Sequence, residues 1–234
     1  MSATEGYTLH IANKNYSSWS LRPWVLLEAL HIPYQEVLHP FGADNNQQRF
    51  RQFSPTAKVP CLHDGEAVIW DSLAIVEYVA EHHPHVWPAD RRARAWARCA
   101  SAEMHSGFQA LRNRCSMSVG VRVRLADVPV DVQQDLARIA ELWQEGLRHF
   151  GGPWLAGDRF TAVDAFFAPV VFRIQTYGLQ LPVQAQDYAL FSLSHPAMQR
   201  WQREALAETA RDPLHEQDHQ QAGVVTADLR TPTA

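Results

Sequence analysis

A hydroxyl-rich segment near the start of the 234-residue chain has the residue types that can handle a thiol. Tyr16-Ser17-Ser18-Trp19-Ser20 comes just before a run of apolar residues at helical spacing, from Leu21 to Leu30. A hydroxyl at a helix N-terminus can donate a hydrogen bond to a bound thiolate, and the helix dipole lowers the pKa of a thiol placed there. The same hydroxyls are natural helix caps. The segment therefore indicates either a cap or a thiolate-binding group.

A second segment, Lys58-Val59-Pro60-Cys61-Leu62, begins a short strand with a proline. If the Val59–Pro60 bond is cis, the turn presents the backbone N–H and C=O of Val59 outwards. An exposed peptide unit of this kind can pair with a bound peptide in antiparallel fashion. The alternative is an ordinary proline of an edge strand.

Asp71-Ser72 precedes an apolar helix that we expect from Leu73 to Glu81. This pair is a plain N-cap in one interpretation. In the other, the free N–H groups of the helix end bind a carboxylate, and Asp71 pairs with an ammonium group. Together with Val59, the pair suggests a peptide ligand with an end like an amino acid.

Other motifs in the chain are better explained without a functional site. His215-Glu216-Gln217-Asp218-His219 matches the zinc-protease pattern HExxH, but it lies in a polar terminal segment, and we expect no metal. Three cysteines without CxxC spacing argue against disulfides and indicate a reduced, cytoplasmic location. No GxSxG motif is visible, which argues against serine hydrolysis.

The order of hydrophobic patterns predicts two domains. Residues 7–83 read as β-α-β-α-β-β-α, with a hairpin at Asp64-Gly65. Residues 84–91 form a proline-containing linker. Residues 92–212 show only helical patterns, including one long helix from Trp96 to Leu111. We expect residues 213–234 to be a disordered tail.

Composition excludes several classes of protein. Hydrophobic residues make up 46% and charged residues 20%, as in a globular protein, and no apolar run is long enough to span a membrane. Residues 1–90 have a net charge of −5, whereas residues 91–124 carry eight arginines and one glutamate. This basic stretch lacks regularly spaced stacking aromatics, so we predict no nucleic-acid partner.

In combination, these motifs resemble the cytosolic glutathione transferases. The resemblance runs from about Tyr7 to about Asp212, and its marks also include Phe160-Thr161-Ala162-Val163-Asp164. It implies an α/β thioredoxin-like N-terminal domain followed by an all-α C-terminal domain. Ser17-Ser18-Trp19-Ser20 is similar to the Ser-Ser-Cys-Ser motif of the zeta class, the maleylacetoacetate isomerases, but Trp19 stands where that class has cysteine. The arginine that the class uses for the substrate carboxylate aligns with Thr176, one turn beyond Arg173.

The resemblance also implies roles for single residues. Ser17 is the expected catalytic serine, with Ser18 and Tyr16 as alternates. The residues expected to bind glutathione, the co-substrate, are Ser17, Lys58, Val59, Pro60, Asp71 and Ser72. For the electrophile pocket we expect Met104, His105, Phe108, Arg112, Arg173 and Tyr177.

The implied function is that of a glutathione transferase that joins the glutathione thiolate to a small electrophile, as in detoxification. A glutathione-dependent isomerase, a peroxide or disulfide reductase, and a non-catalytic interaction module are the alternatives. The family forms homodimers in which the N-terminal domain of one subunit packs on the first long helices of the other. The opposite charges of these two regions predict acidic–basic contacts across such an interface.

Overall fold

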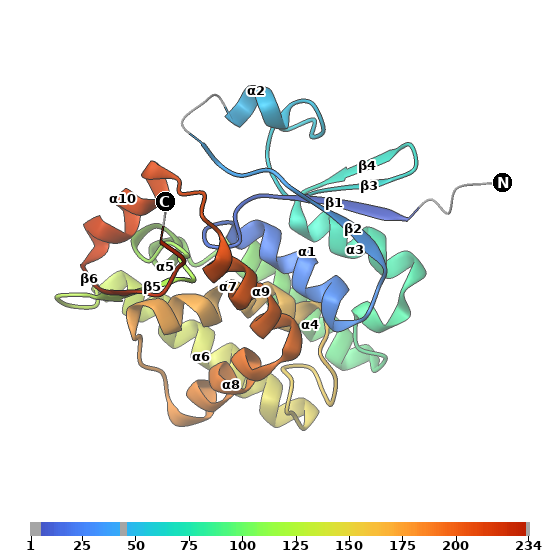
Figure 1. Cartoon of the computed structure of the whole chain (residues 1–234). Helices are drawn as coiled ribbons and strands as arrows, with labels where there is room; N and C mark the ends of the chain where they lie inside the picture. Colours follow the sequence, from blue (N-terminus) through green and yellow to red (C-terminus); the bar gives the residue numbers. More distant parts are fainter. Residues whose placement is uncertain (1–5, 43–45, 233–234) are drawn as a thin grey trace.

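The computed structural model describes residues 6–42 and 46–232. Its N-terminal part is a four-stranded sheet in the order β2-β1-β3-β4, in which β1 runs parallel to β2 and antiparallel to β3 (Figure 1). Helices α1 and α3 cover the side of the sheet that faces the rest of the molecule. The elements are β1 (Tyr7–Ile11), α1 (Ser18–Ala29), β2 (Tyr34–Leu38), α2 (Asn46–Phe50), β3 (Cys61–Asp64), β4 (Ala67–Trp70) and α3 (Ser72–His82).

The remaining chain is mainly helical and is built around α7. Every residue of α7 except Gln175 is buried, because this helix packs against α1 on one side and against α4 and α8 on others. Within the described residues, no helix has both the length and the apolar character needed to cross a membrane. The elements are a 3-10 turn (Pro84–Val86), α4 (Arg91–Ser106), α5 (Gln109–Arg114), β5 (Val121–Arg124), α6 (Val130–Phe150), α7 (Ala162–Tyr177), α8 (Val183–Ser194), α9 (Pro196–Ala207), α10 (Pro213–Ala222) and β6 (Val224–Asp228).

Two helix starts are capped as their sequences predict. Asp71 caps α3 by accepting hydrogen bonds from the backbone N–H groups of Leu73 and Ala74. Thr161 and Asp164 form the capping box of α7. Burial raises the pKa of Asp164 to about 6, although backbone N–H groups and a tyrosine hydroxyl donate to its carboxylate. Both caps satisfy helix N–H groups that would otherwise lack partners.

The expectation of one helix from Trp96 to Leu111 is wrong. The helix α4 ends at Ser106, and Phe108 takes a left-handed conformation with φ of 57° before α5 begins. Gly107 allows this break, because a Cβ atom there would lie 2.8 Å from the backbone oxygen of Glu103. The apolar spacing continues across the break, and for that reason periodicity alone did not reveal it.

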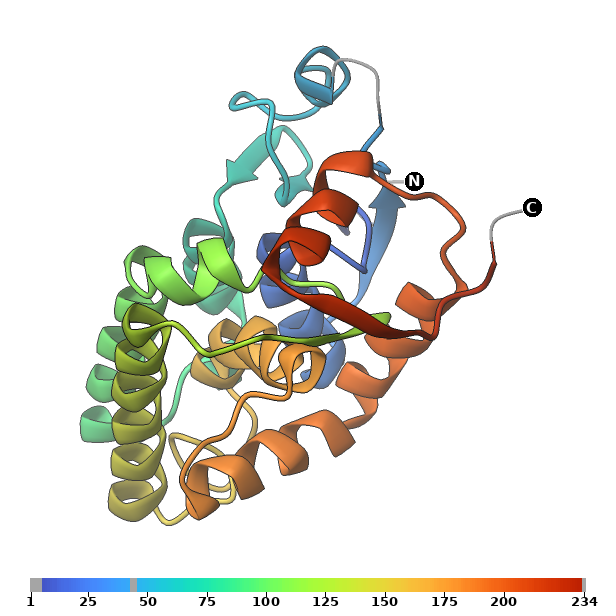
Figure 2. The ribbon, with the colours of Figure 1, turned by 90° about the vertical axis from the view of Figure 1, so that its left-hand side faces the viewer.

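The expectation of a disordered tail after Pro213 is also wrong. The segment forms α10 and then β6, which pairs antiparallel with β5 to make a second, two-stranded sheet (Figure 2). Within the segment, the buried Arg230 binds both Glu216 and Asp228, and Glu216 and Arg230 also bind the hydroxyl of Tyr16 near the start of the chain. The chain after α9 therefore returns to the N-terminal part and ends beside it.

Candidate active site

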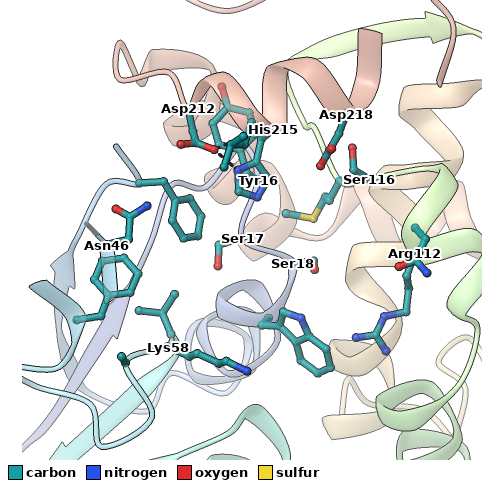
Figure 3. Close-up of a pocket in the computed structure, with 18 of the residues that line it drawn as sticks. Tyr16, Ser17, Ser18, Asn46, Lys58, Arg112, Ser116, Asp212, His215 and Asp218 are labelled. Atoms are coloured by element: carbon teal, nitrogen blue, oxygen red, sulfur yellow. Dashed lines mark hydrogen bonds and ion pairs between the residues drawn. The ribbon is translucent and has the colours of Figure 1, made fainter. Parts of the chain in front are cut away.

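A cavity of about 700 Å³ lies where the N-terminal part meets α5 and α10 (Figure 3). One wall comes from the loop before α1, the segment around α2 and the loop before β3. The opposite wall comes from α5, the chain that follows it, α7 and the start of α10. The lining residues include Tyr16, Ser17, Ser18, Trp19, Phe41, Lys58, Val59, Arg112, Ser116, Arg173, Asp212, His215 and Asp218.

The loop before α1 is fixed by bonds to distant parts of the chain. Asn15 accepts from the backbone N–H of Gly120 and donates to the carbonyl of Ala205. The backbone N–H of Lys14 donates to Glu208, and its carbonyl accepts from the indole of Trp201. Because these partners lie in β5 and α9 regions of the helical part, Ser17 is held between the two domains.

The three candidate hydroxyls of this loop differ in availability. Tyr16 is buried, and its hydroxyl donates to Glu216 and accepts from Arg230. Burial, followed by the hydrogen bond to Glu216, raises the pKa of Tyr16 far above its ordinary value. The Tyr16 hydroxyl is therefore already hydrogen-bonded to the C-terminal segment. Ser17, the N-cap residue of α1, donates to Ser20 over 2.7 Å, and Ser18 begins the helix; both line the cavity.

The segment expected to bind a peptide lies on the opposite side of the cavity from Arg112. The Val59–Pro60 peptide bond is cis, as one interpretation of the sequence required. Val59 and the exposed Lys58 line the cavity, whereas Pro60 is buried behind them. The backbone of Val59 and the ammonium group of Lys58 are thus placed within reach of a bound peptide.

Asp71 and Ser72 lie at the start of α3 and do not line this cavity. One oxygen of Asp71 caps the helix, and the other lies 3.3 Å from Nε2 of His105. The backbone of Asp71 is left-handed, with φ of 74°, a conformation that costs a non-glycine residue about 1–3 kcal/mol. Ser72 is buried, and its hydroxyl lies 3.5 Å from Nη1 of Arg22.

Trp19 is surrounded by guanidinium groups. The Cζ atoms of Arg22 and Arg112 each lie 4.2 Å from the centre of its ring. Burial lowers the pKa of Arg22, Arg112 and Arg173, and repulsion from Arg112 adds to this for the other two. Their hydrogen bonds go to Ser72 and to backbone carbonyls, and none of the three forms an ion pair with a described carboxylate. Asp71 acts on Arg22 from a distance, but the cluster remains a positive region beside the cavity without an ion pair.

The residues expected in the electrophile pocket separate into two groups. Arg112 and Arg173 line the cavity. Met104, Phe108 and Tyr177 are buried in the core and His105 pairs with Asp71, so none of these four lines it. Thr176, which aligns with the zeta-class arginine, is buried and donates to the carbonyl of Ser118.

The residues of α10 that line the cavity were missed. Leu214, His215 and Asp218 form part of its wall together with the N-cap residue Asp212, and the expectation of a disordered tail from residue 213 excluded the first three. The HExxH match did draw attention to two of the histidines. His215 pairs with Asp212, and the buried His219 lies 3.7 Å from Glu216.

None of the three cysteines lines the cavity. Burial raises the pKa of both Cys61 and Cys115 to about 11, and Cys99 is exposed on α4. A thiol with a raised pKa is a poor nucleophile at neutral pH. If thiolate chemistry occurs in this cavity, the thiolate must come from a ligand.

Comparison with protein-family models finds two matches. The glutathione S-transferase N-terminal domain matches residues 16–82, and the glutathione S-transferase C-terminal domain matches residues 89–203. The maleylacetoacetate isomerase of Rattus norvegicus is 28% identical over 197 residues, which cover 78% of this chain and 90% of that protein. A probable maleylacetoacetate isomerase of Caenorhabditis elegans is 27% identical over 70% of this chain and 78% of its own length.

Solved structures share the fold. A theta-class glutathione S-transferase from Xanthomonas axonopodis pv. citri, with glutathione bound, has a TM-score of 0.62 and 22% identity. The match covers 88% of this chain and 100% of that one. A glutathione transferase homologue from Burkholderia, also with bound glutathione, has a TM-score of 0.63 and 23% identity over 86% of this chain and 98% of its own.

Proposed function

The chain belongs to the cytosolic glutathione transferase superfamily, with zeta-class relatives, and we propose that it joins the thiolate of glutathione to a small anionic electrophile. One observation carries the proposal: a single cavity has Ser17 and Val59 on one wall and the arginines Arg112 and Arg173 on the other. The first wall suits a peptide thiol, and the second suits a negatively charged reactant.

Ser17 is proposed to stabilise the thiolate. A free thiol titrates near pH 8.5, so only a few per cent is ionised at pH 7. A lowering of its pKa by about two units makes most of it thiolate, at about 1.36 kcal/mol per unit. One hydrogen bond from the Ser17 hydroxyl, together with the N-terminal dipole of α1, supplies free energy of this size. Ser17 would exchange its present bond to Ser20 for one to sulfur.

Glutathione is proposed to bind through four further residues of the N-terminal domain. Val59 would pair with the cysteinyl backbone, and Lys58 would bind the glycine carboxylate. Asp71 and Ser72 would hold the γ-glutamyl end at the start of α3. In that arrangement the ammonium group of the ligand competes with His105 for the second oxygen of Asp71.

The electrophile class follows from the arginine cluster. Arg112 repels both Arg22 and Arg173; Asp71 offsets part of this at Arg22, and none of the three arginines forms an ion pair with a described carboxylate. A bound anion would relieve this repulsion, and a carboxylate is the common partner of a guanidinium group. Both reactants would then be held close together, which raises the rate of attack by the thiolate.

Glutathione-dependent isomerisation is the second candidate. It is favoured by the similarity to proteins named maleylacetoacetate isomerases and by the same arginines, which suit a substrate with carboxylates. In this reaction the thiolate adds to a carbon–carbon double bond, the new single bond rotates, and the thiolate leaves again. Glutathione is then regenerated rather than consumed.

Retention on immobilised glutathione separates an enzyme from an interaction module. A retained protein is then assayed with matched electrophiles that differ only in a carboxylate or its methyl ester. We expect conjugation to be at least tenfold more efficient, in kcat/KM, with the carboxylate. Loss of glutathione during turnover identifies conjugation, and its conservation identifies isomerisation. Failure of the protein to bind glutathione contradicts the proposed function.

A further inference from the structure

Two cavity residues that the Ser17 mechanism does not use, His215 and Asp212, form a hydrogen-bonded pair. Asp212 is the N-cap of α10, and one of its oxygens accepts from the backbone N–H of His215 at 3.2 Å and lies 2.5 Å from Nδ1 of the same residue. Asp212 is buried, whereas the imidazole is partly exposed and lines the cavity. Because a carboxylate can only accept, Nδ1 carries the proton, and the lone pair of Nε2 is left for another partner.

Two aromatic rings fix the plane of the His215 imidazole. It stacks on Tyr16, with ring centres 5.0 Å apart and planes at 17°, and on Phe41, with ring centres 4.9 Å apart. Tyr16 is the residue before Ser17, and Figure 3 shows His215 and Ser17 around the same cavity. The imidazole is therefore held against the loop where the thiolate is proposed to form.

The segment that carries His215 is fixed in place by contacts with other parts of the chain. The neighbouring Glu216 accepts from the Tyr16 hydroxyl and forms an ion pair with Arg230. Arg230, two residues beyond β6, is buried, and β6 pairs with β5. These contacts hold the imidazole in one position on the cavity wall, and a base has to lie within hydrogen-bond reach of the proton that it accepts.

We propose that His215, oriented by Asp212, is the base that accepts the proton of the glutathione thiol; this rests on the proposed binding of glutathione in the cavity. The S–H bond breaks, its electron pair stays on sulfur, and the proton bonds to Nε2. Asp212 balances the charge of the imidazolium, and Ser17 holds the thiolate by its hydrogen bond. The imidazolium stays beside the thiolate and stabilises it, and after sulfur has reacted the proton passes to the product or to water through the partly exposed ring.

Other charged groups lie around this ring. Asp218 lies one turn further along α10, and Lys58 and Arg112 lie on other parts of the cavity wall. Tyr16 and Phe41 are the residues stacked on the ring. The Tyr16 hydroxyl stays protonated at neutral pH because burial and its bond to Glu216 raise its pKa.

The test uses the full chain with His215→Gln and Asp212→Asn, which retains an N-cap side chain. The control is His149→Gln, on the exposed end of α6. The ultraviolet absorbance of the bound thiolate is titrated in each protein, and kcat/KM is measured against pH. We expect His215→Gln to raise the pKa of bound glutathione and to lower kcat/KM about 100-fold at neutral pH. The loss in kcat/KM should become smaller as the pH approaches the pKa of the free thiol. The control should match the parent.

Three results would overturn or relocate the claim. If His215→Gln changes neither the thiol pKa nor the pH profile of kcat/KM, His215 is not the base, but the proposed function still stands. A higher KM for glutathione by the same factor at every pH makes His215 a ligand-binding group and contradicts its role as a base. If the parent protein does not bind glutathione, the proposed function itself is wrong, and so is the proposed role of His215 as a base.

Discussion

The hydroxyl of Tyr16 donates a hydrogen bond to Glu216, a residue 200 positions further along the chain. This bond joins the loop before α1 to α10, and Arg230 reinforces it by donating to the same hydroxyl. The first and last parts of the chain are therefore joined to each other beside the cavity that both of them line. Tyr16 is therefore not available as a hydrogen-bond donor to the thiolate, since its hydroxyl already donates to Glu216.

The binding of the γ-glutamyl end is tested at Asp71. We predict that Asp71→Asn raises the dissociation constant for glutathione about tenfold or more, because the ion pair with the ammonium group is lost, a contact of about 1.5–3 kcal/mol. Asparagine retains the helix cap and tolerates the positive φ of 74° at this position, so the fold should be retained. Isothermal titration with glutathione measures the effect. Unchanged affinity would exclude Asp71 from the site.

The anionic electrophile is tested at Arg112. We predict that Arg112→Gln lowers kcat/KM at least tenfold for an electrophile with a carboxylate and much less for its methyl ester. Arg114→Gln is the matched control, because Arg114 lies on the same helix but is exposed and paired with Asp131. An equal loss for both electrophiles would show that Arg112 acts on packing around Trp19 and not on charge.

Local signals in the sequence were enough to predict the N-terminal domain. The alternation in Tyr7–Ile11 and the turn at Asp64-Gly65 gave strands that the structure confirms, and Asp71 caps the expected helix. These features depend on neighbouring residues only. The cis bond before Pro60 was one of two interpretations, and the loop geometry decides between them.

The C-terminal segment could not be predicted in the same way. β6 pairs with β5 about a hundred residues earlier, Val121 being opposite Asp228. The helix before it is polar and is held by the ion pair of Glu216 with Arg230 and by the bonds of both residues to the distant Tyr16. Hydropathy carries no information on such pairs. The alternation of valine and arginine in Val121–Arg124 was the one available signal for a strand, and it was overlooked.

Acid should release the C-terminal segment. Burial by itself raises the pKa of Glu216, but hydrogen bonds from Arg230 and Tyr16 outweigh it and lower the pKa below its ordinary value. The stabilisation from Glu216 is therefore complete above a pH of about 4.3 and is lost as the pH falls through the folded-state pKa. We predict faster amide exchange in α10 in acid. Glu216→Gln should show this faster exchange already at neutral pH, and Glu141→Gln on α6 should not.

The homodimer remains a prediction from the family resemblance and the charge asymmetry. Part of the basic stretch is already used within the chain, because Arg98 pairs with Glu77 and Arg114 with Asp131. Arg91 and Arg92 at the start of α4 are exposed. We predict a dimer in sedimentation velocity at micromolar concentration and low salt, weakened by added salt and by Arg92→Glu. A monomer under these conditions would contradict it.

The proposed chemistry depends on whether Ser17 stabilises the glutathione thiolate. The most direct measurement is the titration of bound glutathione, by thiolate absorbance, in the parent protein, Ser17→Ala and Ser18→Ala. We predict that Ser17→Ala raises the thiol pKa towards 8.5, the value of a free thiol, and lowers turnover strongly, while glutathione affinity changes little. Ser18→Ala should behave as the parent does. If Ser17→Ala leaves the thiol pKa and turnover unchanged, the serine is only the cap of α1 and the central claim is wrong.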